Sequence, residues 1–164
     1  MPLTPEDIAL RFREEFENEV IGVRVRSREQ GIYRTVPQSV IWLSISRVVF
    51  HRAVSLLKDM GHIHIACPMA SKEHDDGIEL IYPFTVLTGE GKFMELPVII
   101  SVFLPEDDLR IRSVSDILPG ILYMERETME MLGVIIEDIP DSRRLFTPEN
   151  MQPGVFPMRR EPDA

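Results

Sequence analysis

Apolar side chains recur along the chain with two different spacings, and the spacing predicts the type of each element. Near the start, Thr4 and Asp7 form a capping-box pattern around a proline that suits the first position of a helix. A helix is therefore predicted from Pro5 to about residue 18, and its apolar stripe consists of Ile8, Phe12 and Phe16.

A period of two begins at Ile21, where aliphatic residues alternate with Arg24, Arg26 and Arg28. This alternation predicts a half-buried strand. The arginine row is interpreted as a solvated face, with a ligand patch as the alternative. A second strand is predicted over residues 38–44, and it contains the only tryptophan, Trp42, which we expect in the core or in an interface.

The next segment predicts a helix that Ser44 or Ser46 caps and that Gly61 ends. Its buried stripe is formed by Val49, Ala53, Leu56, Leu57 and Met60. A strand follows from residue 62 to 65, and its alternation places His62 and His64 on one face. Because Cys67 is expected on the other face, surface or hydrogen-bonded histidines are favoured over a metal site.

Residues 71–77 are polar and predict a loop, and two long alternating runs follow at 80–86 and 96–104. The glycine-rich segment 88–92 between these runs predicts a hairpin turn, so the two strands must be antiparallel. Pro83 and Pro97 each remove a ladder donor, which predicts an edge position or a bulge. With a short strand at 110–114, the pattern predicts an α+β domain over residues 1–137, with a mostly antiparallel or mixed sheet covered by helices.

Composition narrows the range of functions. The chain has 164 residues and a formal charge of −9, which disfavours binding to nucleic acid or to an anionic membrane surface and permits docking to a more basic protein face. A single cysteine excludes an internal disulfide and an iron–sulfur cluster held by this chain alone. With so few cysteines, a reduced cytoplasmic setting is the simplest interpretation. No apolar run has the length of a transmembrane helix, and the start of the chain lacks a signal-peptide pattern.

The segment 119–133 predicts a helix that opens at Pro119 and ends at Gly133. Glu125 falls on the apolar stripe of this helix, so its carboxylate must be desolvated, paired or turned toward a partner. Arg126 and Glu130 lie four residues apart and are expected to pair along the helix surface. Glu127 lies on another face of the helix.

A turn with charged residues follows this helix. Pro140 and Asp141 predict the turn, and Arg143 and Arg144 present forked donors that suit carboxylates. Taken one by one, these residues fit a solvated helix end and a turn. The whole string resembles the signature of the 30 kDa subunit family of respiratory complex I, the NADH:quinone oxidoreductase. The same family supplies a subunit to membrane-bound, energy-converting nickel–iron hydrogenases.

The sequence also departs from the usual complex I pattern at three places in this region. Tyr123-Met124 stand where that pattern has a tryptophan, Leu132 replaces an aromatic residue, and Asp138-Ile139 replace Gly-His. These differences resemble the hydrogenase or ferredoxin-linked branch more than the quinone-reducing branch.

The resemblance implies a subunit that binds no cofactor and has no catalytic site of its own, on the cytoplasmic side of the membrane and held there by other subunits. Its implied partners are a large subunit, with a nickel–iron centre or a quinone site, and a small iron–sulfur subunit. The residues implied at interfaces or in locking the fold are Glu125, Arg126, Glu127, Glu130, Gly133, Pro140, Asp141, Arg143 and Arg144.

Residues 138–164 form a different kind of segment, rich in proline and without a regular apolar period. Its apolar side chains predict an extended arm that docks in a groove of another chain or on the flank of its own domain, with a frayed terminus as the alternative. Two other functions stay open. An independent enzyme is disfavoured because Glu125 and Glu127 point in different directions, and a free-standing acidic binding module is the second alternative.

Overall fold

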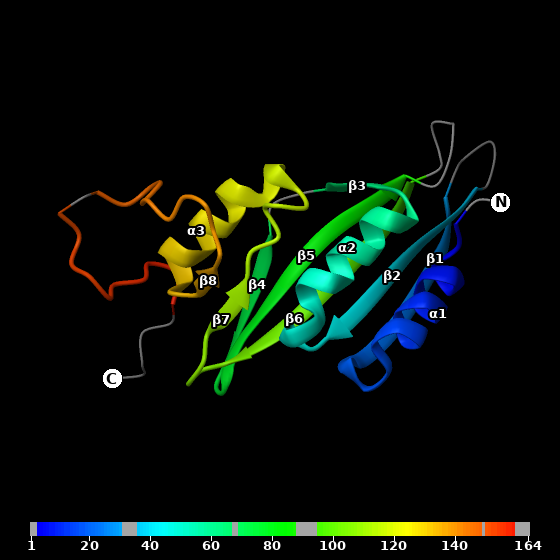
Figure 1. The fold of residues 1–164 in the computed structure, drawn as a ribbon, viewed down its shortest axis with the longest axis horizontal. Coiled ribbons are helices and arrows are strands. Elements are labelled where there is room, and N and C mark those ends of the chain that lie inside the picture. Colours follow the sequence, from blue (N-terminus) through cyan, green and yellow to red (C-terminus); the bar gives the residue numbers. More distant parts are fainter. Residues whose placement is uncertain (1–2, 31–35, 67–68, 88–94, 149, 160–164) are drawn as a thin grey trace.

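A six-stranded mixed sheet forms the middle of the molecule (Figure 1). The structure is a computed structural model that describes residues 3–30, 36–66, 69–87, 95–148 and 150–159. In chain order the strands are β1 (Val20–Gln30), β2 (Val36–Ile45), β3 (His62–Ile65), β4 (Ala70–His74), β5 (Gly77–Leu87) and β6 (Glu95–Pro105). Across the sheet the order is β1-β2-β6-β5-β3, and β4 also pairs with β5. Only β2 and β6 are parallel among these pairs, so the predicted α+β class with a mixed sheet is confirmed.

Two helices pack on one face of this sheet, α1 (Pro5–Phe16) and α2 (Phe50–Met60) (Figure 1). Thr4 and Asp7 form the predicted capping box of α1, and Ser46 caps the short 3-10 turn that leads into α2. Alternate residues of β2, β5 and β6 meet the helices in one core. The largest fully buried side chains of this core include Tyr82, Phe12, Phe50 and Phe84.

The long antiparallel hairpin of β5 and β6 is confirmed, although its predicted turn at 88–92 lies outside the described residues, as does Cys67. The predicted loop at 71–77 is wrong, because residues 70–74 form β4 and pair with β5. This strand carries no apolar alternation since it lies at the margin of the sheet, where most of its side chains meet water. The main-chain hydrogen bonds to β5 stabilise it instead.

Neither proline of the hairpin lies on an edge strand, so that prediction was wrong as well. Pro83 is in β5, between β6 and the pair of short strands β3 and β4. The β3 ladder ends at Phe84 and the β4 ladder begins at Ile81, so Pro83 sits at the gap between them, where one missing donor costs little. Pro97 precedes Val98, the first β6 residue that pairs with β2.

A second unit follows β6 and contacts α2 near both of its ends, where His51 pairs with Asp116 and Lys58 donates to the Ile117 carbonyl. It consists of β7 (Arg110–Arg112), a 3-10 turn (Pro119–Ile121), α3 (Leu122–Leu132) and β8 (Ile135–Glu137). Strands β7 and β8 are parallel and form a separate two-stranded sheet. The sequence predicted β7 and the helix but not β8, which has only three residues. Gly133 ends α3 with φ 74°, the left-handed conformation predicted for it.

The face of the main sheet opposite α1 and α2 carries no helix among the described residues. Trp42 lies on this face and is 40% exposed, so its predicted place in the core is wrong and only the interface alternative stays open. No helix in the described part of the chain has the length and apolar character needed to cross a membrane. Past β8, residues 138–148 and 150–159 continue without a helix or strand.

Candidate functional site

Glu125 lies in the first half of α3 and is fully buried. One carboxylate oxygen accepts a hydrogen bond from the Ser113 hydroxyl at 2.6 Å, and the other accepts one from the Val114 amide at 2.9 Å. The segment that follows β7 thus supplies both donors. The sequence required this carboxylate to be desolvated, paired or turned to a partner, and the structure shows that it is desolvated and hydrogen-bonded within its own chain.

The Tyr82 hydroxyl is a second buried polar group near Glu125. It is the one buried side-chain polar atom without a hydrogen-bond partner among the described residues. Burial raises the pKa of this phenol well above its usual value, and the neighbouring Glu125 carboxylate raises it further. Burial likewise raises the pKa of Glu125, although the hydrogen bonds from Ser113 and Val114 act in the opposite direction.

Arg126, the next residue of α3, fixes the beginning of the C-terminal segment. Its guanidinium donates two hydrogen bonds to the Arg143 carbonyl, at 2.8 and 3.0 Å, and one to the Arg144 carbonyl at 3.3 Å. It also forms an ion pair with Asp141 at 3.2 Å. The guanidinium is buried, so this charge is satisfied almost entirely by the chain segment that it holds.

Glu130, one turn further along α3, binds the next three residues of the same segment. Its carboxylate accepts hydrogen bonds from the amides of Leu145, Phe146 and Thr147 and from the Thr147 hydroxyl. Desolvation raises the pKa of this carboxyl, but the four hydrogen bonds outweigh that effect and hold it at about 2. Consecutive amides that converge on one carboxylate form a small anion-binding nest.

Arg126 and Glu130 therefore form an arm lock, a name we use for these two residues and the backbone of 143–147 that they bind. The predicted pairing of Arg126 with Glu130 along the helix is wrong. Each side chain instead binds the complementary backbone groups of the arm, carbonyls in one case and amides in the other. Main-chain groups without a helix or strand need such partners, and two residues at helical spacing supply them.

The other predicted residues surround the arm lock. The Arg143 guanidinium pairs with Asp141 and is 84% exposed. Hydrogen bonds from Arg143, followed by the charge of Arg126, lower the pKa of Asp141 well below its usual value. Arg144 donates to the carbonyls of Pro148 and Met151 and so closes the next loop.

Glu127 faces away from the lock and lines a small pocket with Met124, Met131 and Met158. Pro140 is exposed in the turn before Asp141. Glycine is required at position 133 for two reasons. A Cβ there would lie 2.6 Å from the Phe156 ring, and the φ angle of residue 133 is positive.

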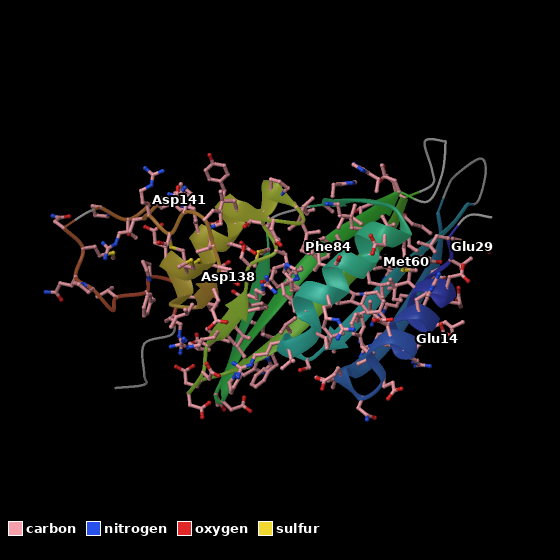
Figure 2. All side chains as sticks on the ribbon, viewed as in Figure 1. Glu14, Glu29, Met60, Phe84, Asp138 and Asp141 are labelled. Atoms are coloured by element: carbon pink, nitrogen blue, oxygen red, sulfur yellow. The ribbon has the colours of Figure 1, made fainter. Side chains whose placement is uncertain are left out.

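After the lock, the arm loops outward and returns to the domain (Figure 1). The Met158 amide donates to the Met131 carbonyl at 3.1 Å, and Arg159 pairs with Glu73 on β4 and with Glu106. Between the arm and α3 lies a cavity of about 190 Å³ lined by both. Figure 2 labels Asp141 at the start of this arm and Asp138 beside β8.

Large apolar side chains on the arm and α3 remain in water. They are Tyr123 (63% exposed), Phe146 (62%), Met158 (61%), Val155 (48%) and Phe156 (38%). An exposed aromatic and aliphatic group of this kind, next to arginines, has the composition of a protein interface. The sequence predicted an arm with apolar side chains but gave no sign of which backbone groups the helix would bind.

The described residues contain no group of three or more histidine, cysteine, aspartate or glutamate side chains arranged to hold a metal ion. His62 and His64 share the exposed side of β3, as predicted. The carboxylates of α3 do not converge on a substrate-sized space, because Glu125 is enclosed in the core and Glu130 is bound to backbone amides.

The arm lock should loosen in acid. Because the folded-state pKa of Glu130 is depressed, its contribution is fully present above the usual value of 4.5 and is lost as the pH falls toward about 2. We expect hydrogen exchange at the amides of Leu145, Phe146 and Thr147, corrected for intrinsic rates and measured by NMR, to lose protection over this range. The variant Glu130→Gln should show weak protection at every pH. Equal protection in both proteins at neutral pH would contradict the role given to this carboxylate.

The fold and site define a two-layer α+β domain whose third helix fixes a C-terminal arm. The chain belongs to the family described as "Respiratory-chain NADH dehydrogenase, 30 Kd subunit", whose sequence profile matches residues 43–164. This match covers the whole site and most of the sheet, and the suspected family resemblance is therefore confirmed.

Named relatives come from both branches of this family. The chain is 31% identical over 159 residues to the membrane-bound hydrogenase subunit beta of Pyrococcus furiosus, which covers 95% of this chain and 84% of the relative. It is 24% identical over 127 residues to NADH-quinone oxidoreductase subunit 5 of Thermus thermophilus, with coverages of 74% and 60%. The chain thus spans less than two thirds of the second relative's length.

The solved structures with a similar fold include the following two. A chain of the membrane-bound sulfane sulfur reductase, an archaeal respiratory membrane complex, matches with a TM-score of 0.67 and 15% identity, covering 93% of this chain and 81% of the other. The trypsin-resistant fragment of Nqo5 matches with a TM-score of 0.58 and 20% identity, covering 82% of this chain and 98% of the fragment.

Proposed function

We propose that this chain is a non-catalytic assembly subunit in the hydrophilic arm of a membrane-bound electron-transfer complex. The observation that carries the proposal is the arm lock. Its two charged residues bind the backbone of a segment rich in exposed apolar side chains and hold that segment in one conformation. An arm held in one conformation before binding loses less entropy when it docks. The arrangement fits a segment that binds neighbouring subunits better than it fits a catalytic site.

A hydrogenase-type or ferredoxin-linked complex is the favoured setting. The similarity to the hydrogenase subunit beta spans 95% of the chain, whereas the similarity to the Thermus NADH-quinone oxidoreductase subunit spans 74% at lower identity. The departures at Tyr123-Met124 and Asp138-Ile139 support the same branch. The 30 kDa subunit of an NADH:quinone oxidoreductase is the second candidate, favoured by the family profile.

In this setting the chain contributes contacts and its partners carry the redox centres. We propose that the arm docks on a large subunit, which holds a nickel–iron centre or a quinone site, and near a small iron–sulfur subunit. Attachment to the cytoplasmic face of the membrane would be indirect, through these partners. The interface role belongs to the exposed groups around the lock, above all Arg143, Tyr123 and Phe146.

Charge reversal at the arm tests the proposal. The double variant Arg143→Glu/Arg144→Glu should keep the circular dichroism spectrum and core stability of the domain but reduce its recovery in the assembled complex by about tenfold or more. A control, Arg11→Glu/Arg13→Glu on the exposed side of α1, makes the same charge change away from the arm and should assemble normally. Wild-type assembly in the arm variant would contradict docking through these arginines.

A free-standing acidic binding module is the alternative of another class. It predicts a chain that is recovered alone from cells at native expression level, with no large or iron–sulfur subunit in stoichiometric amounts. Co-purification of the untagged neighbours with the wild-type chain distinguishes the two functions.

A further inference from the structure

The edge of the main sheet formed by β1 is open to another strand. β1 spans eleven residues, and β2 is the only described strand that pairs with it. A long edge strand presents a row of unpaired amides and carbonyls, which readily accept another strand. Glu29, near the end of β1, and Asp141, on the arm, lie in opposite halves of the molecule along its longest axis, so this edge and the arm lock are on different sides of the domain (Figure 2).

The two faces of β1 differ in charge, with arginines on one face and valines on the other. Arg24 pairs in register with Trp42 of β2, and Trp42 pairs with Ile99 of β6, so Arg24, Arg26 and Arg28 lie on the open face of the sheet. All three arginines are exposed and have no hydrogen-bond or ion-pair partner among the residues that the structure describes. On the other face of β1, Val23 is half-buried and Val25 is 36% exposed.

A row of three exposed cations on a chain of net charge −9 is complementary to a partner that presents a row of anions. Alternate residues of a strand are about 6.8 Å apart, which is also the spacing of every second side chain in an extended ligand. A segment that alternates carboxylates with aliphatic residues therefore matches both faces of β1. Its carboxylates would meet the arginines and its aliphatic residues would cover Val23 and Val25.

We propose that the open edge of β1 binds an extended acidic segment of another protein as an additional strand, with a carboxylate at every second position facing Arg24, Arg26 and Arg28. A second copy of this chain fits poorly, because antiparallel pairing of two β1 edges about a two-fold axis places arginine against arginine.

A synthetic peptide of about ten residues with alternating Glu and Val provides the probe. Trp42 is the only tryptophan of the chain and lies beside Arg24, so its emission reports binding to the full-length protein. We expect saturable binding that Arg24→Glu/Arg26→Glu weakens by about tenfold or more. The arm variant Arg143→Glu/Arg144→Glu makes the same charge change and should bind as wild type, which separates this proposal from the assembly function.

Backbone pairing is tested by methylating alternate amide nitrogens of the peptide in each of the two possible sets. Loss of binding with only one set supports strand addition, because only one edge of the peptide faces β1. Equal binding by all methylated peptides, equal binding by wild type and the β1 variant, or no binding at all would overturn the proposal. It would equally be overturned if the arginines mediated binding to anionic lipid vesicles, or self-association in sedimentation, while the peptide did not bind.

Discussion

Replacing Glu125 by alanine should lower the free energy of unfolding by about 3 kcal/mol, since the change leaves a cavity and a buried amide without an acceptor. The amide is that of Val114, and the Ser113 hydroxyl loses the same partner. Thermal or chemical denaturation of the isolated chain measures the effect. The helix α3 should loosen within its own unit, because the residues that Glu125 binds belong to the segment between β7 and α3.

Glu125→Gln is the matched control, as the amide keeps the size of the side chain and can accept from Val114. The raised pKa of Glu125 means that burial favours its neutral form more in the folded chain than in the unfolded one. Stability linked to this group is therefore present below its usual value of 4.5 and declines as the pH rises through the folded-state pKa. The glutamine variant should lack this decline. An alanine variant as stable as wild type would contradict the role of Glu125 in the core.

Replacing Arg126 by alanine should release the arm while the main sheet stays folded. The change removes the donors to the Arg143 and Arg144 carbonyls and one partner of Asp141. Loss of hydrogen bonds from a buried cation costs about 2 kcal/mol, which corresponds to a roughly 30-fold increase in local opening. Initial cleavage by thermolysin near Phe146 should accelerate by that factor under conditions in which opening is faster than cleavage.

Arg126→Lys distinguishes charge from geometry. A lysine can keep the ion pair with Asp141 but lacks the planar fork that donates twice to the Arg143 carbonyl. Cleavage of the lysine variant should therefore be intermediate between wild type and alanine. Equal cleavage rates in all three proteins would show that the arm is held by its other contacts, such as those with Glu130 and those of Arg159.

Local patterns were sufficient for elements whose stability depends on neighbours in sequence. The capping box at Thr4, the left-handed Gly133 and the alternation along β5 and β6 each specify a backbone conformation from a few residues. Local patterns did not predict the strands that are defined only by their pairing with a neighbouring strand. Strands β4 and β8 are short, and the first has no apolar alternation, so only their contact with β5 and β7 defines them.

The sequence by itself determined the fold class, the helix that ends at Gly133, the family and the presence of a charged buried position at Glu125. Only the tertiary structure decided which groups the charged side chains of the third helix bind. Arg126 and Glu130 had the spacing of a surface pair, but the unpaired carbonyls and amides of a returning arm compete for them more strongly than they attract each other across water. The location of that arm depends on long-range packing, which the spacing of residues within one helix does not encode.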